Sequence, residues 1–86
     1  VTLQVVKTEI LRSSDSVMEY AEIIEVENSD GVKESRVAFI FLHGNVYVVS
    51  ECSYDEATQT YTVKTEEGRS YIITRVNEST VEIKEL

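Results

Sequence analysis

The sequence predicts a mainly β protein, a small antiparallel meander of about six to seven strands that forms a partly open barrel or a two-sheet sandwich. Short runs of β-branched and aromatic residues alternate with polar residues along most of the chain. Turn residues separate these runs at short, regular intervals, which is typical of small all-β folds. With 86 residues, the chain is expected to form a single small β domain over residues 1–86.

The first strand is expected at residues 2–11, where the imperfect alternation suits a bulge near Val5 and Val6. The next segment, residues 17–28, fits two structures. A short helix near residues 16–27 would begin at Ser16, which stands at capping-box spacing from Glu19. A strand is the preferred interpretation, because the turn residues that follow lead directly into the next strand.

The strongest signal is a hairpin over residues 36–50. Two apolar runs flank His43, Gly44 and Asn45, residue types that tolerate the positive φ of a tight hairpin turn. The first run is apolar on both faces, which predicts a central strand covered on both sides. On this interpretation one face carries Val37, Phe39 and Phe41.

After the hairpin, residues 53–59 are expected to form a polar connection. Three further strands are predicted at residues 60–65, 69–76 and 80–86. This second half resembles SH3-like and other small barrels in the rhythm of its hairpins, although no family motif aligns residue by residue. The residues expected in the core are Phe39, Ile40, Phe41, Val48, Val63 and Ile72.

Charge narrows the classes of partner. Sixteen acidic residues against eight basic ones give a net charge of −8, and the basic residues are dispersed. Binding of phosphate backbones draws on clustered Lys and Arg, so direct nucleic-acid binding and binding to anionic membranes are not expected. No apolar run approaches the length of a membrane span. A basic protein partner fits better. The chain is expected to fold alone or as a homodimer.

No motif for catalysis, cofactor binding or metal binding stands out. Cys52 is the only cysteine, which excludes an intrachain disulfide and favours a reducing, cytoplasmic location. It is expected to be a small core residue. On the predicted hairpin His43 lies too far from Cys52 for a nucleophile and its base. The protein is therefore expected not to be an enzyme.

Carboxylates are the most distinctive functional feature. Glu19, Glu25 and Glu27 would share one face of a strand over residues 17–28 and are predicted to bind a partner. Alternate residues of a strand lie about 6.6–6.8 Å apart, close to two steps of the roughly 3.4 Å charge repeat of a DNA strand. Such a row could imitate a phosphate backbone, or it could simply be a solvated sheet face.

The sequence thus favours a non-enzymatic protein–protein interaction module that acts through an exposed edge strand or an acidic face. Strand addition at an edge needs only backbone groups and leaves little trace in a sequence. Two alternatives remain open at this point. One is an acidic DNA mimic that inhibits a nucleic-acid-binding protein, and the other is a small ligand-binding β-barrel.

Overall fold

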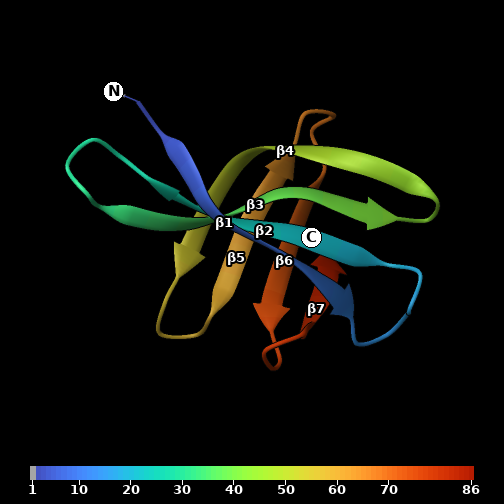
Figure 1. Cartoon of the computed structure of the whole chain (residues 1–86). Coiled ribbons are helices and arrows are strands. Elements are labelled where there is room, and N and C mark those ends of the chain that lie inside the picture. Colours follow the sequence, from blue (N-terminus) through green and yellow to red (C-terminus); the bar gives the residue numbers. More distant parts are fainter. Residues whose placement is uncertain (1) are drawn as a thin grey trace.

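The computed structural model describes residues 2–86, which form seven strands and contain no helix (Figure 1). The strands follow one another around a closed barrel in chain order, so the predicted antiparallel meander is confirmed. Because no helix is present in this range, none is long and apolar enough to cross a membrane. The strands are β1 (Gln4–Ser13), β2 (Tyr20–Glu27), β3 (Lys33–Leu42), β4 (Asn45–Asp55), β5 (Thr60–Thr65), β6 (Ser70–Arg75) and β7 (Thr80–Glu85).

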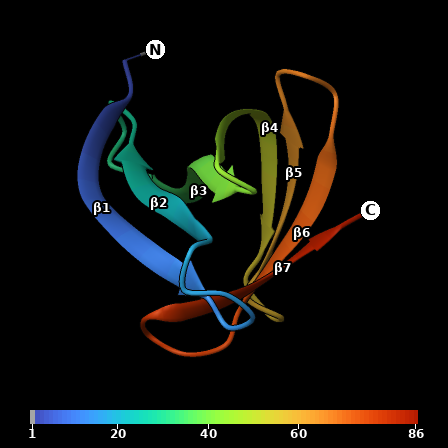
Figure 2. The ribbon, with the colours of Figure 1, turned by 90° about the vertical axis from the view of Figure 1, so that its right-hand side faces the viewer.

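Two short seams close the barrel. Between β1 and β7, only Arg12 and Ser13 pair with β7, in parallel orientation. Between β3 and β4, four residue pairs join the strands next to their turn. Away from these seams, β1, β2 and β3 form one curved sheet and β4 to β7 form the other, and the ribbons of β1–β3 and β4–β6 stand apart at one end (Figure 2). The fold is therefore a barrel that is open at one end.

Three bulges, in β1, β3 and β4, decide which side chains face the interior. The bulge predicted near Val5 and Val6 is confirmed, because the β1–β2 register shifts between Val5 and Lys7. A second register shift leaves Ala38 as the extra residue of β3. Since a bulge reverses the alternation of faces, Val37 faces inward together with Ile40 and Leu42. The prediction that Val37 shares a face with Phe39 and Phe41 is wrong for this reason.

The hydrophobic core is formed only by side chains on the inner, concave faces of the two sheets. Ile40 and Val63 are buried as predicted, at 0% and 2% exposure. The prediction is wrong for Val48, which is 48% exposed, and for Phe39, Phe41 and Ile72, which are half-buried. These four side chains lie on the outer surface because a small barrel has one interior, so a strand that is apolar on both faces still leaves one face outside. The main core comprises Leu11, Ala21, Ile23, Val37, Ile40, Leu42, Tyr47, Tyr61, Val63, Tyr71, Ile73 and Val81.

The predicted β3–β4 turn is confirmed in its conformation. Leu42 pairs with Asn45, so His43 and Gly44 form a two-residue loop, with φ of 52° and 80°. Positive φ at both central residues is the type I′ geometry whose twist matches that of the strands.

Two other segments differ from an expectation: the helix considered near residues 16–27 is absent, and the connection expected at residues 53–59 is shorter. Residues 20–27 are strand, not helix, and the hydroxyl of Ser16 accepts a bond from the Met18 amide within a turn. The polar connection is shorter than expected, because β4 continues to Asp55.

Candidate functional site

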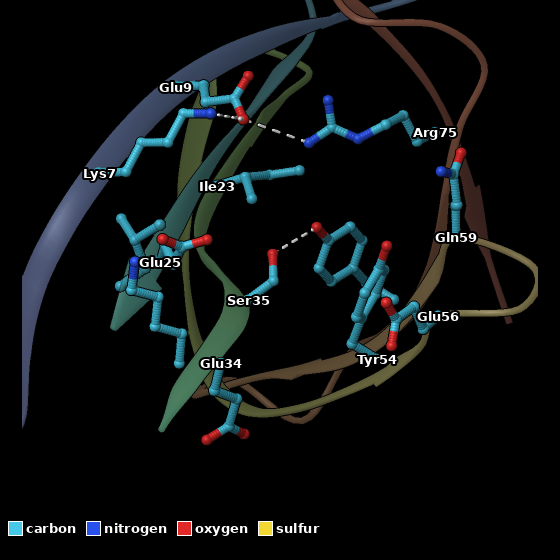
Figure 3. A pocket seen from close by; sticks show the side chains of 13 residues that line it. Lys7, Glu9, Ile23, Glu25, Glu34, Ser35, Tyr54, Glu56, Gln59 and Arg75 are labelled. Atoms are coloured by element: carbon cyan, nitrogen blue, oxygen red, sulfur yellow. Dashed lines mark hydrogen bonds and ion pairs between the residues drawn. The ribbon is translucent and has the colours of Figure 1, made fainter. Parts of the chain in front are cut away.

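A pocket of about 610 Å³ occupies the open end of the barrel (Figure 3). Side chains from six strands and the β4–β5 loop line it, so it belongs to the interior of the barrel rather than to one loop. We call it the mouth of the barrel. The residues lining the mouth are Lys7, Glu9, Ile23, Ile24, Glu25, Lys33, Glu34, Ser35, Tyr54, Glu56, Gln59, Tyr61 and Arg75.

A tyrosine pair forms one wall of the mouth. The rings of Tyr54 and Tyr61 stack with their centroids 4.4 Å apart. Tyr61 is fully buried, and its hydroxyl is 2.7 Å from the Ser35 hydroxyl on the opposite sheet. The register shift between Val49 and Glu51 reverses the faces of β4 and turns Tyr54 inward. Burial, followed by the neighbouring Tyr61, raises the pKa of the Tyr54 phenol, so Tyr54 stays neutral at physiological pH.

An ion cluster spans the opening between β1 and β6. Arg75 Nη2 lies 3.4 Å from Glu9 Oε1, and Lys7 Nζ lies 3.7 Å from the same oxygen. The Arg75 side chain is only 19% exposed. Burial opposes its charge, but hydrogen bonding to Tyr61 and the nearby Glu9 carboxylate outweigh that effect and raise the pKa of Arg75. Arg75 therefore remains charged and anchors this side of the mouth.

Carboxylates outnumber basic groups among the side chains of the mouth, and Glu56 lies beside Tyr54 (Figure 3). Four Glu and three basic residues line the whole pocket. Glu9 is shared by Lys7 and Arg75, and Glu34 pairs with Arg36 at 3.2 Å. Within residues 2–86, Glu25 and Glu56 form no ion pair, and neither does Lys33 of the same lining, so one carboxylate remains in excess. A neutral aromatic surface bordered by such carboxylates favours a cationic group, through charge attraction and cation–π contact.

The three glutamates predicted to bind a partner do not form one continuous row. Glu25 lines the mouth. Glu19 precedes β2 at its opposite end, where one of its oxygens lies 3.8 Å from His43 Nδ1. Glu27 is the last residue of β2. Between Glu19 and Glu25, the same face carries two buried core residues, Ala21 and Ile23. The face that these glutamates share is thus the interior face of the barrel.

The remaining chemical candidates lie apart from the mouth. His43 belongs to the β3–β4 turn, whereas Cys52 lies within β4 and is packed against the core. Burial raises the pKa of the Cys52 thiol, as expected for a core residue rather than a nucleophile. In the part of the chain that the structure describes, no group of three or more His, Cys, Asp or Glu side chains could hold a metal ion.

No local sequence pattern points to the tyrosine pair or to the Arg75 cluster. Tyr54 fell in a segment predicted to be a connection, and Arg75 lies 66 residues from Glu9. The apolar alternation around Cys52 and Tyr54 is the one pattern that could have extended β4 to include Tyr54. No protein-family model, no curated protein and no solved structure matches this chain.

Proposed function

We propose that this protein is a non-enzymatic interaction module that receives an extended, basic segment of a partner protein along the edge of β1, with basic side chains entering the mouth. The observation that carries the proposal is the open edge of β1. Only Arg12 and Ser13 of this strand pair with β7, so within residues 2–86 the edge from Gln4 to Leu11 has no neighbouring strand. An open edge is a ready template for strand addition.

The direction of the backbone groups supports this proposal. The amides of Arg12 and Ser14 donate to Ser79 and Val81, whereas the amide of Ser13 donates to Glu19 on the other side. Backbone groups alternate in direction along a strand, so Thr8 and Ile10 turn their N–H and C=O groups toward the open edge. This edge is protected by the bulge at Val6 and by the inward-pointing charges of Lys7 and Glu9.

The mouth supplies selectivity for side chains. Lys7 and Glu9 extend inward from β1 into the pocket, so alternate side chains of an added strand would also point into it. On the opposite wall they would meet Tyr54 and Glu56. An aromatic ring next to a carboxylate favours Lys or Arg over acidic side chains.

The two alternative functions receive less support. A DNA mimic needs a continuous exposed row of carboxylates, and the row from Glu19 to Glu27 is interrupted by core residues. A small-ligand carrier would use the same mouth, but such sites are mostly apolar with few polar groups, whereas this mouth is lined mainly by charged side chains.

The edge is tested with the variant Thr8→Pro and the matched control Thr8→Val. Proline removes an outward N–H without deleting a β1–β2 hydrogen bond, and valine keeps both the N–H and the β propensity. Fluorescence anisotropy with extended Lys- and Arg-rich peptides should show at least about tenfold weaker binding for Thr8→Pro and unchanged binding for Thr8→Val. Equal affinity of two correctly folded variants, or no binding by the wild type, would contradict the proposal.

The mouth is tested separately with Glu25→Gln combined with Glu56→Gln. Gln keeps the shape of the side chain and removes its charge, so affinity for basic peptides should fall and lose most of its salt dependence. An unchanged affinity and salt dependence would confine the contact to the β1 edge.

A further inference from the structure

The outer surface of the barrel carries an apolar face on the side away from the core. Six apolar side chains from β1 to β4 form it, and we call it the outer aromatic face. Its members are Ile10, Tyr20, Phe39, Phe41, Val46 and Val48.

The strand register makes this face continuous. Tyr20 pairs with Phe41, and Phe41 pairs with Val46 on the next strand. One row further along, Phe39 pairs with Val48. The ring of Tyr20 stacks on Phe41 with centroids 5.1 Å apart and meets Phe39 edge-on at 6.3 Å. Val46 and Val48 remain about half exposed, at 56% and 48%. Across four strands at about 4.8 Å spacing, the outermost strands of the face lie roughly 14 Å apart, so the apolar side chains form one patch and are not scattered singly.

Two opposite charges lie on the same face without an ion-pair partner. Arg12 pairs across the ladder with Tyr20, and Glu22 pairs with Ile10 and Phe39. Within residues 2–86 neither Arg12 nor Glu22 forms an ion pair, and Arg12 Nη1 instead donates to the carbonyl of Val17. On the ideal ladder, the two residues lie diagonally, roughly 8 Å apart.

We propose that the outer aromatic face is the contact between two copies of this chain, related by a twofold axis. A twofold interface brings the same patch of each copy together, so the patch must complement itself. An axis that passes between Arg12 and Glu22 places Arg12 of each copy opposite Glu22 of the second copy. Tyr20 and Phe41 then lie near the axis, where the apolar contact is best shielded from water.

The charge of the whole chain sets the strength of this contact. Two copies at net −8 repel each other, and the face is small compared with the roughly 800 Å² that each partner contributes to a standard interface. The dimer is therefore weak and reversible, with a dissociation constant in the micromolar range or above. The mouth takes no part in the dimer contact, and β1 contributes the side chains of Ile10 and Arg12 but none of its edge backbone groups, so this inference stands apart from the proposed function.

The apolar contact is tested by sedimentation equilibrium at fixed ionic strength with Val46→Lys and Val76→Lys. Both valines are 56% exposed, and both variants gain one positive charge, but Val76 lies outside the face. The dissociation constant should rise at least about tenfold for Val46→Lys and change less than about threefold for Val76→Lys. A wild type that stays monomeric up to several hundred micromolar would overturn the proposal, as would equal effects of the two variants.

The charge contact is tested with Glu22→Arg and with the exchange Arg12→Glu plus Glu22→Arg. The single variant makes the chain two units less negative, so general repulsion falls and a non-specific dimer would become tighter. In the proposed dimer, the new arginine of one copy would face Arg12 of the second copy, so the dimer should instead become about five- to tenfold weaker. The exchange restores the net charge and the pair, and it should return the dissociation constant to within about threefold of wild type. Tighter association of Glu22→Arg, or no recovery in the exchange variant, would refute this arrangement.

Discussion

Adjacent residues of β3 should contribute very differently to stability. Ile40 is fully buried in the core, whereas Phe41 lies half-buried on the outer face and stacks on Tyr20. Ile40→Ala removes about three methylene equivalents at roughly 0.8 kcal/mol each and leaves a cavity, so the free energy of unfolding should fall by about 3–4 kcal/mol. Phe41→Ala loses a partly exposed ring and one aromatic pair, which should cost about 1–2 kcal/mol.

Thermal melts followed by circular dichroism measure this difference. For a domain of this size, 1 kcal/mol corresponds to a shift of about 4–8 °C, so Ile40→Ala should melt at least about 10 °C lower than wild type. Phe41→Ala should melt about 4–16 °C lower than wild type on the same scale, and by less than Ile40→Ala. Low protein concentration keeps self-association out of the comparison. An equal or larger loss for Phe41→Ala would mean that the outer face, and not the concave face, holds the barrel together.

Two further predictions concern the thiol and the tight turn. Burial raises the pKa of Cys52, so iodoacetamide should modify this thiol more slowly in the folded protein than in urea. Because the folded pKa exceeds the unfolded value, the thiol should also lower the free energy of unfolding as pH rises above about 8.5. Equal alkylation rates would refute this, and Cys52→Ser is the control for the pH effect. Replacing His43, at φ 52°, by Asn creates the preferred Asn-Gly type I′ turn and should raise the free energy of unfolding in urea by about 0.5 kcal/mol, whereas a loss would show that the His43 contact with Glu19 matters more.

The barrel makes the proposed edge docking compatible with a stable fold. Seven strands close through two short seams, so the core remains sealed at one end while β1 keeps an unpaired edge at the other. A fully closed barrel would have no edge, and an open sheet would leave more of its core uncovered.

Local patterns in the sequence predicted most of the strands, the tight turn at His43-Gly44 and the bulge near Val5 and Val6, but they left residues 17–28 open between strand and helix and missed the end of β4. These features depend on neighbouring residues: side chains alternate along a strand, and tight turns require residues that accept positive φ. The His43-Gly44 turn and the burial of Val63 were predictable for that reason.

Only the tertiary structure decided which face of β3 is interior and what gathers at the mouth. Alternation fixes the faces only relative to each other, and the bulge at Ala38 reverses them at a place set by the register with β2. The Arg75–Glu9 pair joins residues 66 positions apart, and the Ser35–Tyr61 bond crosses between sheets. Such contacts depend on how the barrel closes, which no local pattern encodes.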